Sequence, residues 1–167
     1  MTDSPAVLER VRDSKHAGWM PRDAADVGTG EAGSIDNGAM TRIQVRIDPA
    51  SRRIGEAVFK VLGCRAAIAS ASLVAERLQG ALADAVRDME AVAIVAELQL
   101  PMERASVAAL AVDAARRAIE DWEQKKAAED SEQRRAVEDS AQRNAAEDAE
   151  QTQTRGGRGL QPRHTGR

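Results

Sequence analysis

The stretch TRIQVRIDPASRRIGEAVFKVLGCRAAIASASLVAERLQG, residues 41–80, decides the fold. Its first part alternates strictly between polar and apolar residues, which predicts a strand with one buried and one wet face. The apolar face carries Ile43, Val45 and Ile47, and the wet face carries Arg42, Gln44 and Arg46. Residues 49–55 have the composition of a turn, and residues 56–63 are a second β-rich run. The two runs therefore predict an antiparallel pair.

The second part of this stretch changes to a helical pattern directly after Cys64, the single cysteine of the chain. The predicted helix ends at Gly80, a natural position for a C-terminal cap. One or two short helices are expected to follow and to end before Pro101, and a long helix is expected from about Glu103. Its predicted buried stripe consists of Val107, Leu110, Ala114 and Ala118.

Upstream of these elements, the glycine-rich residues 27–40 predict an edge strand followed by a loop. The spacing GTGEAG, residues 28–33, superficially matches a phosphate-binding loop. Such a loop leads into a long helix, whereas here an alternating strand comes next. The expected fold class is α+β: a small antiparallel sheet of about three strands, covered on one face by helices, then a long C-terminal helix and a charged tail.

Composition limits the classes of function. Aromatic residues make up 2% of the chain, so Ala, Val, Leu and Ile build its core. No apolar run is long enough for a membrane helix or resembles a signal peptide, and one cysteine forms no internal disulfide. A net charge of -3 gives no general attraction to nucleic acid. We therefore expect a cytoplasmic protein that binds neither membranes nor nucleic acid.

The predicted domains are residues 1–122 and a charged, helical to disordered tail, residues 123–167. The tail has nine-residue repeats that start at Lys126, Arg135 and Asn144. Nine residues turn a helix by about two and a half turns, so successive apolar pairs face opposite sides and no coiled-coil seam forms. A solvated helix that frays into disorder is expected. The last residues, 154–167, carry four arginines and no acid, and a disordered terminus is favoured there over RNA binding.

Three segments carry a family resemblance: SKHAG (14–18), GCRAAIASASL (63–73) and LPMERASVAALAVDAARRAIEDW (100–122). In this order they resemble the NifU/IscU family of iron–sulfur cluster scaffold proteins, and most of all the N-terminal domain of NifU. The resemblance covers about residues 7 to 122, and it implies the same α+β fold.

The resemblance also implies a function. The family assembles a transient 2Fe–2S or 4Fe–4S cluster on three cysteines, because soft thiolates bind iron and sulfide well. A cysteine desulfurase supplies the sulfur, and apo-proteins receive the cluster. The implied protein acts in iron–sulfur cluster assembly and is not an enzyme. No Ser/His/Asp or Cys/His constellation suggests catalysis, and no catalytic residue is assigned.

This chain is a divergent member, because it keeps one of the three ligand cysteines. Asn37 and Val107 stand where the family has the other two, and Cys64 remains as the candidate ligand for iron or a cluster. Asp36 is a second candidate metal ligand, a hard carboxylate one residue early. A single chain is therefore not expected to hold a cluster in the family's manner. A homodimer would supply two Cys64 thiolates, and external thiols would complete the set.

Two interpretations of Cys64 stay open. It is either a small residue that fills a strand-to-helix turn or a thiol with a metal-binding or sulfur-carrying role. Two functions follow. In the first, the protein is a divergent scaffold or accessory protein that binds iron or a cluster weakly or with a partner. In the second, it is a degenerate interaction module that binds no metal and recognises a cysteine desulfurase or an apo-target.

Overall fold

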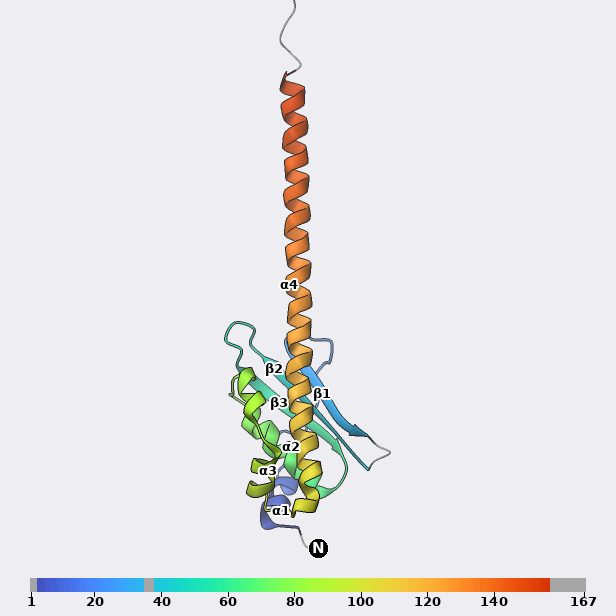
Figure 1. Ribbon diagram of the computed structural model, residues 1–167, viewed down its shortest axis with the longest axis vertical. Coiled ribbons are helices and arrows are strands. Elements are labelled where there is room, and N and C mark those ends of the chain that lie inside the picture. The colour runs from blue at the N-terminus through green and yellow to red at the C-terminus, as the bar shows by residue number, and fades with distance from the viewer. Residues whose placement is uncertain (1–2, 35–37, 157–167) are drawn as a thin grey trace, which may run out of the picture. The chain divides into compact units, whose positions relative to one another are not determined.

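The computed structural model of the protein describes residues 3–34 and 38–156. Its elements are α1 (Pro5–Arg12), β1 (Val27–Ser34), β2 (Ala39–Ile47), β3 (Ile54–Leu62), α2 (Arg65–Leu78), the 3-10 helix η1 (Ala83–Asp88), α3 (Ala91–Glu97), the 3-10 helix η2 (Met102–Arg104) and α4 (Ala105–Gly156). The chain divides into two compact units, residues 1–126 and residues 127–167. The first holds an antiparallel sheet of order β1-β2-β3 (Figure 1), which confirms the predicted α+β class.

The predicted alternation in β2 is confirmed for its apolar face and is wrong at one position of its wet face. Ile43, Val45 and Ile47 are completely buried. Gln44, expected in water, is only 3% exposed. Its side chain accepts a hydrogen bond from the amide of Met20 and donates to the carbonyl of the same residue, both at 2.8 Å. An amide side chain has both a donor and an acceptor, so it pairs with main chain lying across the sheet.

The first helix of the predicted pattern, α2, packs on β2 and β3 and is flanked by α1 and α3. Cys64 is its N-cap residue. The helix ends at Leu78, and Gly80 follows with φ of +79°, which confirms the expected glycine near the C-terminal end. The short helices η1 and α3 end before Pro101, as predicted.

The glycines of β1 allow α4 to lie directly on the strand. A Cβ atom added to Gly28 would lie 2.0 Å from the carbonyl oxygen of Ala118, and one added to Gly30 would lie 1.9 Å from that of Ala114. Both distances are far below contact, so only glycine fits. The edge strand is confirmed, and the spacing that resembles a phosphate loop is explained by this close packing.

The free edge of β3 is closed by main chain from two other segments. Near its start, Ile54 accepts a hydrogen bond from the amide of Gly80 and donates to the carbonyl of Ala81. In its second half, Phe59 donates to the carbonyl of His16 and accepts from the amide of Gly18. Segments 16–18 and 80–82 therefore satisfy backbone groups that an edge strand leaves open.

The sheet end at the start of β3 is fixed by one buried ring. Trp122 of α4 is 1% exposed. The guanidinium carbon of Arg52 lies 5.2 Å from the ring centroid, and the Lys126 ammonium lies 5.5 Å from it. Arg52 also pairs with Asp84 and Glu123, at 3.1 and 2.7 Å. We call these five residues the Trp122 clamp.

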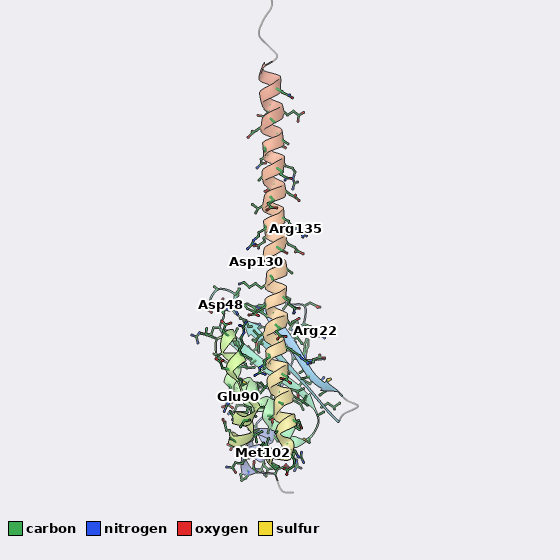
Figure 2. All side chains as sticks on the ribbon, viewed as in Figure 1. Arg22, Asp48, Glu90, Met102, Asp130 and Arg135 are labelled. Atoms are coloured by element: carbon green, nitrogen blue, oxygen red, sulfur yellow. The ribbon has the colours of Figure 1, made fainter. Side chains whose placement is uncertain are left out.

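The second unit contains the continuation of α4 to Gly156. The side chains described between residues 127 and 151 are all exposed, and those of Asp130 and Arg135 project from the helix (Figure 2). The backbone is therefore helical as far as residue 156, with exposed side chains as far as residue 151, and residues 157–167 lie outside the described residues. The domain boundary after Trp122 stays a prediction. Within the described residues, no helix combines the length and the apolarity needed to cross a membrane.

Candidate functional site

Cys64 lies where β3 ends and α2 begins, in an extended conformation with φ of -77° and ψ of 170°. Its side chain makes no capping hydrogen bond to the helix, and the residue is exposed. The thiol therefore lies exposed at the N-terminus of a 14-residue helix, where the first N–H groups give a positive end.

One cation contacts the sulfur. Arg104 of η2 donates from Nη1 to Sγ of Cys64 at 3.2 Å. The neighbouring Arg65 is turned to the N-terminal segment, where it pairs with Asp3 at 3.2 Å. A guanidinium on the sulfur attracts anionic groups and repels a metal cation, so iron must displace Arg104 to use this thiol.

Residues next to the other two expected ligand positions lie close to the Cys64 turn at this end of the sheet. Leu62 pairs with Met40, so β2 begins beside the Cys64 turn. A Cβ atom at Gly63 would lie 3.3 Å from that of Ala39, which follows the first ligand loop. Arg104, which contacts the Cys64 sulfur, lies three residues before Val107 in the third segment. The structure thus brings Cys64 together with both neighbouring segments, and Val107 is half-buried in the first turn of α4.

The other predicted ligand positions are not described. Asp36 and Asn37 lie outside the described residues, so the role of Asp36 as a metal ligand stays a prediction. Among residues 3–34 and 38–156, no group of three or more His, Cys, Asp or Glu side chains is arranged to hold a metal ion. His16 approaches the main chain: its Nδ1 lies 3.2 Å from the carbonyl oxygen of Ala57.

Two exposed apolar side chains lie close in sequence to Cys64 and to its partner Arg104. Leu62, two residues before Cys64, is 54% exposed. Met102, two residues before Arg104 in η2, is 70% exposed and is labelled in Figure 2. We call Leu62, Cys64, Met102 and Arg104 the Cys64 site.

A cavity of about 110 Å³ lies beside the Cys64 site, between the start of α2 and the turn before η2. Its lining residues are Asp3, Ser4, Ala66, Gln99, Leu100, Pro101 and Arg104. Sequence reasoning missed Arg104 and Asp3, because both act through contacts between distant segments. The position of Arg104, shortly before the expected ligand position Val107, was the one signal in the sequence for its place at the site.

Comparisons with known proteins identify a family. Residues 2–129 match the family described as the NifU-like N terminal domain. Iron-sulfur cluster assembly protein 1 of Oryza sativa is 33% identical over 120 residues, which cover 72% of this chain and 70% of that protein. The iron-sulfur cluster assembly scaffold protein IscU of Rickettsia prowazekii is 32% identical over 126 residues, 75% of this chain and 95% of that protein.

A solved structure agrees in fold. The N-terminal part of a nitrogen-fixing NifU-like protein from Brucella abortus superposes with a TM-score of 0.58 at 18% identity, covering 73% of this chain and 94% of that one. At this identity the likeness concerns the fold alone. The family match and the sequence relatives extend over most of the chain, and on these grounds the protein belongs to the NifU-like N-terminal domain family.

Proposed function

We propose that this protein acts in iron–sulfur cluster assembly as a divergent scaffold or accessory protein, in which Cys64 supplies one thiolate to iron or to a cluster. The observation that supports this most is the position of Cys64: an exposed thiol with Ala39 beside the preceding residue and Arg104 on its sulfur. The relatives' names give the pathway, since they are cluster assembly proteins.

The number of thiols in one chain limits how the protein can hold iron. Iron in a cluster takes about four ligands, and clusters are held by several thiolates. The described residues of one chain offer a single thiol. Iron or a cluster is therefore cargo that this protein holds weakly or shares. A second copy would bring another Cys64, and a cysteine desulfurase or an apo-protein would bring its own thiols.

The chemistry of the thiol supports a cytoplasmic setting. Cys64 is free and exposed, and such a thiol persists in a reducing compartment. Arg104 on the sulfur suits a carrier of anionic sulfur species better than a permanent iron site. This combination favours transient binding with a partner over stable binding by one chain, and it requires no catalytic step of the protein itself.

Anaerobic reconstitution tests the proposal. The full chain is incubated with ferrous iron, sulfide and a cysteine desulfurase, and visible absorption, iron per chain and molecular mass are measured. We expect iron well below the content of a three-cysteine scaffold, and we expect Cys64→Ser to abolish it. Ser106→Ala, at an exposed position in the first turn of α4, is the matched control and should change nothing. Iron content near zero in the wild type, or equal in wild type and Cys64→Ser, contradicts the proposal.

The second candidate function is an interaction module without metal. It is favoured by Arg104, which already occupies the sulfur, and by the exposed Leu62 and Met102 beside it. Here the protein binds a desulfurase or an apo-target through the Cys64 site. Isothermal titration with the desulfurase should then show binding that Cys64→Ser retains and that Leu62→Asp with Met102→Asp removes. If no desulfurase or apo-target binds, this candidate fails.

A further inference from the structure

The Cys64 site holds a cation that iron binding does not use. Nη1 of Arg104 donates to Sγ of Cys64 at 3.2 Å. A guanidinium is always charged in proteins and has donors but no acceptor, so this contact occupies a lone pair of the sulfur. A metal ion takes its electrons from the same sulfur and carries charge of the same sign. Arg104 and iron therefore compete for Cys64.

The backbone fixes the base of the Arg104 side chain but not its end. Arg104 is the last residue of η2, and its amide donates to the carbonyl of Pro101 at 2.8 Å. The residue is half-buried. A long side chain exchanges between staggered rotamers while its Cα atom stays in place. The guanidinium can therefore leave the sulfur without any change in the turn that carries it.

A second position for the guanidinium lies beside the first. Arg104 lines the cavity of about 110 Å³ next to the Cys64 site, and Asp3 lines the same cavity. Asp3 pairs with Arg65 through Oδ2, at 3.2 Å. Because a carboxylate accepts hydrogen bonds on both of its oxygens, Asp3 can pair with a second guanidinium. The cavity therefore offers Arg104 a counter-charge away from the sulfur.

We propose that Arg104 determines which groups reach Cys64. While its guanidinium lies on the sulfur, the site favours the approach of anionic groups and excludes iron. When iron binds, the guanidinium moves into the cavity and pairs with Asp3. This inference rests on the proposed function, because it concerns the same thiol, but the selection by charge is measurable without iron.

Alkylation measures the selection by charge. Cys64 is the single cysteine of the chain, so labelling of the full chain reports this thiol alone. Iodoacetate and iodoacetamide each transfer a carbon group to the thiolate and release iodide, and they differ in charge. The ratio of their two rate constants, measured at one pH and at low ionic strength, therefore isolates the electrostatic effect on the incoming group.

Arg104→Gln keeps a long polar side chain and removes its charge. It should lower the ratio of the iodoacetate rate to the iodoacetamide rate about fivefold, the factor for unit charges about 4 Å apart in water. Arg104→Lys should keep the ratio near that of the wild type. Lys60→Gln is the matched control, because it removes the same charge from an exposed position in β3. Circular dichroism checks the fold. An unchanged ratio in Arg104→Gln, or an equal fall in Lys60→Gln, overturns the proposal.

Iron loading tests the second position of the guanidinium. In the anaerobic reconstitution, Arg104→Gln should raise the iron content per chain, and adding Cys64→Ser should abolish the gain. Asp3→Asn should lower the iron content, because the displaced guanidinium loses its counter-charge in the cavity. Combined with Arg104→Gln, Asp3→Asn should have no further effect. An equal loss of iron with and without Arg104 overturns the movement to Asp3.

The outcomes separate this inference from the proposed function. Iron that depends on Cys64 but is unchanged in Arg104→Gln overturns the role of Arg104 and keeps the proposed function. If no variant holds iron at Cys64, the proposed function fails, and the alkylation ratio alone decides whether Arg104 selects groups by charge.

Discussion

The two ends of the sheet are built differently. β3 is nine residues long, with Arg52 before its first residue and Cys64 after its last. At the first end, Trp122 is 1% exposed, Arg52 and Lys126 contact its ring, and Arg52 also pairs with Asp84 and Glu123. At the other, the thiol has one contact to a side chain, Leu62 is 54% exposed and Met102 is 70% exposed.

This difference teaches which substitutions the fold tolerates. Leu62, Cys64 and Met102 are exposed and bury little area, so their replacement changes chemistry and leaves the packing intact. In the Trp122 clamp the ring itself is buried, and the charged residues around it contact the ring or one another. Substitutions at the exposed positions around Cys64 are therefore expected to leave the fold intact, whereas replacement of Trp122 is not.

The largest expected effect comes from Trp122→Ala. Removing a buried aromatic ring costs about 3–5 kcal/mol of unfolding free energy, and here it also leaves Arg52 and Lys126 without their ring contact. Urea denaturation followed by circular dichroism measures the loss. Trp19→Ala is the matched control, because Trp19 is 73% exposed and should cost less than about 1 kcal/mol. Equal losses of unfolding free energy in the two variants would contradict the proposed structural role of Trp122.

The next effect is expected for Gly30→Ala. The new methyl group meets the carbonyl oxygen of Ala114 and forces α4 away from β1, at a cost of about 1–3 kcal/mol or more. Gly55→Ala in β3 is the control, because a Cβ atom there has no neighbour within 4 Å. The difference between their urea midpoints measures the close contact. A Gly30→Ala variant as stable as the control contradicts it.

A smaller effect is expected on acidification, at the turn that carries the Trp122 clamp. Hydrogen bonds from the amide of Ala50 and the hydroxyl of Ser51 lower the pKa of Asp48. A lowered pKa in the folded state stabilises the protein above the unfolded pKa of about 3.9, and this stabilisation is lost as the pH falls through the folded value. Asp48→Asn should therefore flatten the pH dependence of the urea midpoint between about pH 5 and 2. An unchanged slope would refute this role.

The smallest effect on stability is expected for Cys64→Ser. The residue is exposed and its thiol makes one contact to a side chain, so the unfolding free energy should change by no more than about 0.5 kcal/mol. Thermal denaturation measures this. A loss above about 2 kcal/mol would identify Cys64 as a packing residue and would weaken its proposed role in binding iron.

Local patterns in the sequence predicted the elements well. Alternation placed Ile43, Val45 and Ile47 on the buried face, and Gly80 marked the end of α2. Gln44 was assigned wrongly because its partner, Met20, comes from a segment 24 residues earlier that has no regular pattern. The contact of the β1 glycines with α4 was not predicted either, because the α4 carbonyls that they accommodate are more than 80 residues away in the sequence.

The candidate site was predictable only in part. A motif identified Cys64, because its neighbours in the sequence carry the resemblance. Arg104 is 40 residues away and belongs to no motif that predicts contact with a thiol. Its role depends on the turn after Pro101, which presents the guanidinium to the start of α2. Tertiary placement of this kind cannot be inferred from spacing along the chain.

The contact of Gly28 and Gly30 with α4 has a consequence for the substitutions that the two elements accept. The strand meets the carbonyl oxygens of Ala118 and Ala114, which every residue type carries, so side chains of α4 that point away from β1 do not enter this contact. On the strand the opposite holds, because any side chain at position 28 or 30 would collide with the helix main chain. Variation is therefore expected to be one-sided: exposed positions of the helix can change, whereas these two strand positions cannot.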